Sequence, residues 1–274
     1  AENVLAPLNG PGDKQGCQYD PQSRSVRTPD GFKAAYKQYA EGGWTALACT
    51  PEFGGQGLPH VLNMLVEEMT CSANLSLGMY PGLTHGAINA LTSHGTPEQQ
   101  AQYLPRLISG EWTGTMCLTE PHAGSDLGII RTKAEPQADG SYKVSGTKIF
   151  ITGGEHDLTD NIIHLVLAKL PDAPAGSRGI SLFLVPKVLV NDDGSLGERN
   201  DVLLAGLFHK MGWRGTTSTA LNFGDNGECV GYLVGKPHAG LSYMFQMMNE
   251  ARIGVGIRNA LAFKRSEEHT SELQ

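Results

Sequence analysis

Residues 116–133 read MCLTEPHAGSDLGIIRTK, and this stretch changes character within a few positions. It begins with the apolar Met116, Cys117 and Leu118, which are typical of a buried strand. It then runs through Thr, Glu, Pro, Gly, Ser and Asp, which favour turns, for longer than a simple β-connection needs. The stretch therefore predicts a strand followed either by an ordinary surface loop or by a loop that holds a ligand.

The composition of the 274-residue chain is that of an acidic globular protein. Hydrophobic residues make up 40% and charged residues 18%, and 28 Asp+Glu against 21 Lys+Arg give a net charge of −7. The chain has no basic cluster that would favour a nucleic-acid partner, and no apolar run approaches the ~18 residues that span a bilayer. Five widely spaced cysteines without a CxxC pair indicate a reducing compartment and argue against zinc. We expect a cytoplasmic protein with no metal and no membrane partner.

Helical patterns dominate the chain up to residue 112. A helix start is predicted at Thr28-Pro29-Asp30, and Thr96 to Gln99 form a capping box. An apolar face with helical spacing comprises Leu62, Leu65, Val66 and Met69. After residue 112, short apolar runs alternate with turn signals such as Asp139-Gly140, which predicts successive β-strands.

The order of these patterns predicts an α+β multi-domain fold. We assign residues 1–112 to an N-terminal helical domain, 113–235 to an antiparallel β-barrel and 236–264 to the start of a second helical domain. No GxGxxG follows a strand, so a dinucleotide-binding Rossmann sheet is not predicted. Residues 265–274 (RSEEHTSELQ) resemble the translation of a sequencing adapter and are left out of the fold assignment. Together with the missing initiator Met, this segment leads us to expect a chain truncated at both ends.

Three ordered motifs carry a resemblance to a known family. They read CLTEPHAGSDL, KVSGTKIFITGG and KMGWRGTTSTALNF, and they begin at Cys117, Lys143 and Lys210. Together with TPEFGGQGLP and YLPRLISGEWTG in the helical part, this order resembles the acyl-CoA dehydrogenases over nearly all of residues 1–264. EPHAGSDL and SRGISLFLVPKVLVNDDGSLGERNDV most resemble the 3-methylmercaptopropionyl-CoA dehydrogenase branch of that family.

The resemblance implies that the loop opened by residues 116–119 binds FAD. The positions that match the family's flavin and phosphate contacts here are Met116, Leu118, Thr119, Gly124 and Ser125. Backbone N–H groups and hydroxyls suit this role because they bind the flavin's polar edge without adding a charge. Asp126 is expected to stabilise the turn and to cap the segment that follows. His122, which replaces a Gly common in the family, is expected to face solvent.

The second motif is implied to cover the other face of the flavin with Phe150, Ile151 and Thr152. The Phe150 ring, at a position where many relatives carry Trp, is expected to pack on the isoalloxazine, and the Thr152 hydroxyl to bind near N5. Without the resemblance, Phe-Ile-Thr in a strand would be assigned to the core. Residues 210–215 are expected to form a turn between two strands.

The resemblance further implies α,β-desaturation of an acyl-CoA thioester, in which a glutamate removes the α-proton and the β-hydrogen leaves as hydride. Substrate contacts are implied for Ser125, Asn249, Glu250 and Arg252, although Arg252 could equally pair with a nearby carboxylate. Some relatives carry the glutamate immediately before this arginine, where this chain has Ala251; Glu250 is turned from that direction by about 100°. The catalytic residue is therefore unknown and expected beyond the end of the chain. We expect the chain alone to be inactive and to hold FAD weakly.

The family also implies an electron-transfer flavoprotein as electron acceptor and a homo-oligomeric parent protein. Two alternatives stay open. An acyl-CoA oxidase, which passes electrons to oxygen, carries the same motifs. The second alternative is a DNA-binding, damage-response relative of the family. The sequence has no basic stripe, which argues against it. The sequence does not fix the acyl chain length.

Overall fold

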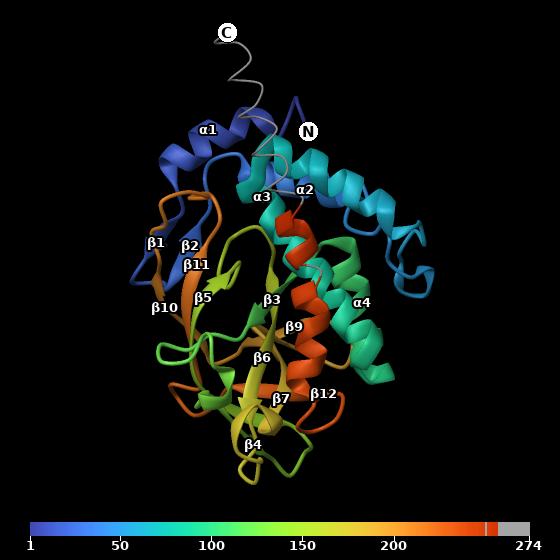
Figure 1. Cartoon of the computed structure of the whole chain (residues 1–274). Helices are drawn as coiled ribbons and strands as arrows, with labels where there is room; N and C mark the ends of the chain where they lie inside the picture. The colour runs from blue at the N-terminus through green and yellow to red at the C-terminus, as the bar shows by residue number, and fades with distance from the viewer. Residues whose placement is uncertain (250, 257–274) are drawn as a thin grey trace.

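The computed structural model describes residues 1–249 and 251–256. Most helices lie together on one side of the molecule and the strands on the other (Figure 1). The helices are α1 (Ala6–Gln15), α2 (Phe32–Glu41), α3 (His60–His94) and α4 (Pro97–Ser109), and a C-terminal helix covers residues 240–249 and 251–256. The predictions for Glu250 and for residues 257–274, including the adapter-like segment, lie outside the described residues.

Eight strands form one sheet, in the order β10-β11-β5-β12-β7-β6-β3, and β4 pairs with both β5 and β6. The sheet therefore curls back on itself. Its strands are β3 (Trp112–Cys117), β4 (Lys133–Pro136), β5 (Tyr142–Thr152), β6 (Asn161–Lys169), β7 (Ile180–Pro186), β10 (Val202–Leu207), β11 (Ser218–Phe223) and β12 (Val230–Val234). Two small hairpins, β1 (Gln18–Asp20) with β2 (Ser25–Arg27) and β8 (Val188–Val190) with β9 (Leu196–Arg199), lie outside it. The predicted order of helices, strands and helices is confirmed.

Two parallel pairings, the short one of β4 with β6 and the longer one of β3 with β6, correct the prediction of an antiparallel barrel. β3 runs parallel to β6, from Trp112 opposite Asn161 to Cys117 opposite Val166. The chain leaves β3 through the long loop after Cys117, passes through the β4–β5 hairpin, and only then enters β6. It has turned round in between, so it returns beside β3 in the original direction. A strand pattern in the sequence carries no information on this pairing.

The two predicted helix starts have different outcomes. At Thr96 the capping box is confirmed, since the Thr96 side chain accepts from Gln99 N (3.2 Å) and the Gln99 side chain from Thr96 N (3.1 Å). The start predicted at Thr28 is wrong, because α2 begins only at Phe32. The Thr28 hydroxyl instead donates to Asp157 (2.6 Å), a residue from the β-rich part. The Thr28 side chain therefore bonds a residue far away in sequence and does not cap the helix.

The β1–β2 hairpin is an element that the sequence patterns did not predict. It follows Cys17, whose backbone N–H donates to Arg214 O (3.0 Å) in the loop before β11. The Tyr19 hydroxyl donates to Leu204 O in β10 (3.4 Å), and Val26 is buried in the core of the sheet. Residues that we assigned to the helical domain therefore pack on the strands.

Helix α3 bends sharply at Asn74, which has non-helical backbone angles (φ −155°, ψ 92°). The fully buried Asn74 side chain accepts from Leu77 N (3.0 Å) and donates to Leu5 O (3.2 Å), so it caps the second half of α3 and fixes it to the N-terminus. In Figure 1 the first half of α3 points away from the sheet and the second half runs down along it. The bend creates an elbow between the two halves.

The second half of α3 packs closely on β3. The Thr84 hydroxyl accepts from Gly114 N (3.1 Å), and a Cβ on Gly114 would collide with the Ala87 side chain. On the first half of α3 the predicted apolar spacing is present, but Leu65 and Met69 are 46% and 58% exposed. Within residues 1–249 and 251–256, no helix is both long and apolar enough to cross a membrane.

Candidate functional site

A cavity of about 230 Å³ lies where the helices meet the sheet. Both halves of α3 line it, on either side of the elbow, and the sheet contributes Met116 from β3 and Thr152 from β5. The C-terminal helix adds Ala251 and Val255. The full lining comprises Tyr39, Trp44, Thr45, Asn63, Glu67, Thr70, Gly78, Met79, Pro81, Gly82, Leu83, His85, Met116, Thr152, Ala251 and Val255. Residues from all three predicted parts of the chain thus meet at one site.

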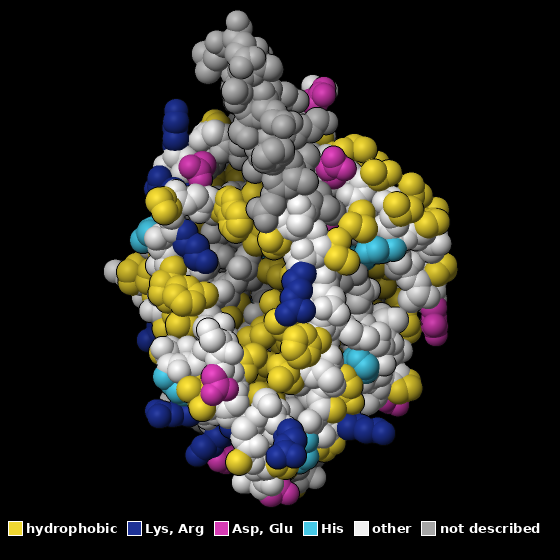
Figure 2. Space-filling model, viewed as in Figure 1, with side chains coloured by type: hydrophobic (Ala, Val, Ile, Leu, Met, Phe, Trp, Pro, Cys, Tyr) yellow, Lys and Arg dark blue, Asp and Glu magenta, His cyan; other side chains and the backbone are white. Residues whose placement is uncertain are grey.

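The wall of this cavity combines apolar side chains, neutral hydrogen-bonding groups and one carboxyl side chain, that of Glu67. Burial, with a smaller effect of His60, lowers the pKa of His85 to about 4, so its ring is neutral at physiological pH. Burial also raises the pKa of Tyr39 to about 12, which keeps the phenol protonated. On the outer surface, hydrophobic side chains gather along the junction of the C-terminal helix and the sheet, whereas charged side chains are scattered (Figure 2). The site suits a largely apolar ligand with a few polar atoms.

The loop after β3 lies edge to edge with β5. The carbonyl of Thr119 accepts from Ile149 N (2.9 Å), and Glu120 forms a β-bridge with Ala123. Gly124 and Ser125 follow on the exposed surface. The structure therefore brings the first motif beside the second, which contains Phe150 and Thr152. Which face of a flavin each segment covers stays a prediction.

Phe150 is held in an unusual conformation. Its φ is +58°, in a region that non-glycine residues rarely occupy, at an irregularity in the β5–β11 pairing. The bulge turns its ring outward, where it is 50% exposed, packs on Phe208 (centroids 4.6 Å apart) and lies 5.5 Å from the Lys210 ammonium. Strain and exposure at an aromatic residue indicate a functional position rather than a core one.

A buried ion pair fixes the first motif to the second. Lys148 in β5 is fully buried, and its ammonium donates to Glu120 (2.9 Å) and to Leu118 O (3.0 Å). Glu120 also accepts from Arg131 N (2.7 Å), Thr132 N (3.0 Å) and the Thr132 hydroxyl (2.6 Å). Burial raises the pKa of Glu120, but Lys148 and these donors outweigh it and hold that pKa below its usual value. The carboxylate is thus ionised and anchors the loop that contains Thr119.

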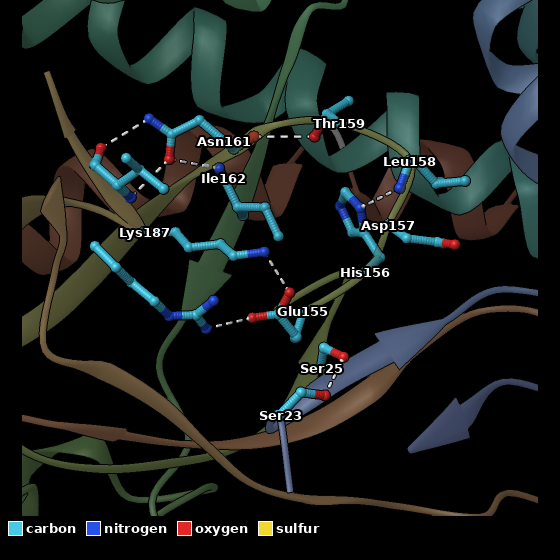
Figure 3. A network of polar contacts seen from close by, with 12 residues as sticks. Ser23, Ser25, Glu155, His156, Asp157, Leu158, Thr159, Asn161, Ile162 and Lys187 are labelled. Carbon is cyan, nitrogen blue, oxygen red and sulfur yellow. Dashed lines mark hydrogen bonds and ion pairs between the residues drawn. The ribbon is translucent and has the colours of Figure 1, made fainter. Parts of the chain in front are cut away.

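A second buried network follows Thr152 directly in sequence (Figure 3). Glu155, three residues after Thr152, pairs with Lys187 at the end of β7 and with Arg199 in β9 (2.9 Å). Nearby, Asn161 accepts from Val188 N (2.9 Å) and donates to Val188 O (2.8 Å). The Phe150–Thr152 segment is therefore anchored on both sides, by Lys148 before it and Glu155 after it. Such support holds site residues in a fixed geometry.

Sequence patterns missed both anchors, although one signal was available. Lys148 has the same parity in β5 as the buried Val144, so alternation places a charge on the inward face. A lysine at such a position needs a buried partner. The identity of that partner, Glu120, follows only from the tertiary structure. The polar wall at His85 and Tyr39 gave no sequence signal, because both lie in ordinary helical patterns.

Other predicted residues have mixed outcomes. Asp126 accepts from Gly128 N (2.8 Å) and caps a 3₁₀ turn, as predicted. His122 is exposed and lies 3.1 Å from Ile129 O. Asn249 and Arg252 are exposed and contact each other (3.1 Å), and neither is among the residues that line the cavity. In the described residues Arg252 thus pairs with an amide rather than a carboxylate, and its role in binding stays a prediction.

The described residues fit the expected FAD. The hydroxyls of Thr119 and Thr152 form no hydrogen bond within residues 1–249 and 251–256, although both side chains are half-buried. The exposed Phe150 ring, two residues before Thr152 in β5, offers an aromatic surface. A flat ring system with a polar edge needs hydroxyls that can bond its edge and an aromatic surface that can cover its face.

Comparison with known proteins places this site in context. Residues 18–111 match the family model of the acyl-CoA dehydrogenase N-terminal domain, and residues 115–226 that of the middle domain. The chain is 47% identical over 266 residues to 3-methylmercaptopropionyl-CoA dehydrogenase of Ruegeria pomeroyi, covering 97% of this chain and 44% of that protein. It is 42% identical over 265 residues to butyryl-CoA dehydrogenase of Syntrophomonas wolfei, covering 93% and 43%. The chain thus spans less than half the length of these curated relatives.

Solved structures share the fold. An acyl-CoA dehydrogenase from Geobacillus kaustophilus superposes with a TM-score of 0.74 at 24% identity, over 95% of this chain and 61% of that one. An acyl-CoA dehydrogenase from Bacillus anthracis, solved in complex with FAD, gives a TM-score of 0.72 at 25% identity, over 89% and 38%.

Proposed function

Since the chain belongs to the acyl-CoA dehydrogenase family, we propose that the whole protein is an FAD-dependent oxidoreductase that desaturates an acyl-CoA thioester between Cα and Cβ. One observation carries the proposal: a single cavity joins Met116 and Thr152, from the two flavin motifs, to Ala251 on the C-terminal helix. A substrate in this cavity would lie between the flavin-binding strands and the helices.

We propose that FAD is held by Met116, Leu118, Thr119, Gly124, Ser125, Phe150, Ile151 and Thr152. FAD, when bound, supplies the acceptor for a hydride. The residues of the chain orient the flavin ring and shield it from water. We assign the Thr119 and Thr152 hydroxyls to the polar edge of the flavin and the Phe150 ring to one of its faces. The buried ion pairs of Lys148 and Glu155 hold these groups in fixed positions.

The thioester end is assigned to Ser125, Asn249, Glu250 and Arg252, as the resemblance implies. Desaturation also needs a carboxylate that takes the α-proton. Because the chain spans 44% of the length of its Ruegeria relative, we propose that this carboxylate comes from the remaining length of the whole protein. We also propose the division into domains at 1–112, 113–235 and 236–264, which rests on the order of helical and strand patterns in the sequence.

Two finer assignments belong to the same proposal. The similarity to the Ruegeria and Syntrophomonas enzymes supports a short-chain substrate, with 3-(methylthio)propanoyl-CoA as the first candidate. An electron-transfer flavoprotein is the proposed acceptor, and the whole protein is proposed to be a homo-oligomer.

The test uses the purified whole protein and its flavin absorbance near 450 nm. Anaerobic addition of short acyl-CoA thioesters is expected to bleach the flavin, and electron-transfer flavoprotein to restore its colour. A protein that contains no flavin, or a flavin that no acyl-CoA thioester bleaches, would refute the proposal. Rapid release of hydrogen peroxide in air would instead identify an acyl-CoA oxidase.

A further inference from the structure

We propose that the cavity selects short acyl groups that carry a hydrogen-bonding atom near their end, and that His85 recognises this atom. The inference rests on the proposed function and deepens it, because it names a chemical property of the substrate. It is carried by the size of the cavity, the position of His85 and the bonding state of its ring.

The size of the cavity limits the acyl group to a short chain. A water-sized group takes up about 30 Å³ of liquid volume, so a cavity of 230 Å³ has room for roughly seven such groups. An acyl group of five or so heavy atoms beyond the thioester carbon fills this space. A long hydrocarbon chain exceeds this volume.

His85 lines the cavity from the second half of α3. Its neighbours on α3, Thr84 and Ala87, face β3, where Thr84 accepts from Gly114 N. Each residue on a helix is turned by about 100° from the one before it, so His85 points away from the strands. It contacts Cys49 and stacks on His60, both in the helical part of the chain. An acyl group with its reacting carbons beside Met116 and Thr152 therefore extends toward His85.

The His85 ring is poised to bond a ligand atom. The side chain is 8% exposed, and within the described residues its ring nitrogens make only one long contact, from Nδ1 to the Cys49 sulfur at 4.0 Å. A neutral imidazole offers one N–H donor and one acceptor nitrogen. A saturated tail would exclude water from this ring and leave it unbonded, whereas an ether, thioether or hydroxyl would bond to it.

The experiment compares acyl groups of one length in the whole protein. Values of kcat/KM are measured for pentanoyl-CoA, 3-(methylthio)propanoyl-CoA and 3-methoxypropanoyl-CoA, with a dye as electron acceptor. The variants are His85→Leu, which removes the hydrogen-bonding atoms at similar volume, and His85→Gln, which keeps them. Leu83→Ile is the matched control, because it changes the shape of the same wall without adding or removing a hydrogen-bonding atom. Dividing each variant's preference by that of the wild type cancels the intrinsic reactivity of the substrates.

We expect His85→Leu to lower the preference for the methoxy over the pentanoyl substrate by roughly fivefold, the discrimination due to one neutral hydrogen bond. His85→Gln is expected to restore most of the preference, and Leu83→Ile to leave it unchanged while altering both rates alike. If His85→Leu fails to fold, His85→Ile provides the same comparison. An unchanged preference in the apolar variant overturns the role of His85 and leaves the proposed function standing. If the wild type turns over none of these or any other acyl-CoA, the proposed function itself fails.

Discussion

Replacing Lys148 by Met tests whether the buried pair holds the two motifs together. The substitution leaves the Glu120 carboxylate, 3% exposed, without its cationic partner. Breaking a buried pair from one side costs about 3–5 kcal/mol, because a charge stays buried and uncompensated. Since Glu120 keeps the donors of Arg131 and Thr132, we expect the lower end, about 3 kcal/mol. This is a large part of a typical unfolding free energy of ~5–15 kcal/mol.

The assay is urea unfolding at several pH values. With a slope of about 2 kcal/mol per molar urea, the midpoint should fall by roughly 1.5 M at neutral pH. In the wild type the pKa of folded Glu120 lies below its usual 4.5, so its contribution is complete above that pH and is lost as the pH falls further. In Lys148→Met the lowering effect of Lys148 is lost, and only the donors of Arg131 and Thr132 oppose burial, so the pKa of Glu120 is higher than in the wild type. The difference between variant and wild type should therefore shrink as the pH falls toward 4.5.

Two results would refute this reasoning. One is a stability deficit that is the same at pH 7 and pH 5. The other is a Lys148→Met, Glu120→Gln double variant whose cost equals the sum of the two single costs, since coupled residues depart from additivity.

Three further predictions concern packing, capping and cofactor binding. Gly114→Ala should lower the free energy of unfolding by about 1–3 kcal/mol, because the added Cβ collides with Ala87. Gly206→Ala, whose added Cβ has nothing within 4 Å, should change it by no more than about 0.5 kcal/mol. Thermal melts of the two variants test this difference. Thr96→Ala removes the capping box of α4 and should cost about 1 kcal/mol, and an unchanged melting temperature would contradict the role of the cap. Phe150→Ala in the whole protein should weaken FAD binding by roughly threefold to tenfold, as expected for loss of an aromatic contact, while Phe150→Trp should keep it. Titration with FAD measures both, and equal affinities for the two variants would rule out stacking.

The success of the sequence predictions depended on how local each signal was. The capping box at Thr96 and the turn at Asp126 were predicted correctly, because both bonds join residues that are two or three positions apart. The helix start at Thr28 was wrong because its hydroxyl bonds Asp157, 129 positions away. Phe150 followed from resemblance, but its strained, outward-turned conformation depends on the bulge opposite β11.

By itself, the sequence determined the order of helices and strands, the two motifs that we propose bind the flavin, and the family to which the chain belongs. These depend on apolar spacing and on short motifs, which a chain records residue by residue. Only the tertiary structure decided that β3 runs parallel to β6, that Lys148 pairs with Glu120, and that α3 bends at Asn74 to open a cavity facing Met116 and Thr152. Each of these joins residues far apart in the chain, and such contacts form only when packing and the burial of charge select one arrangement.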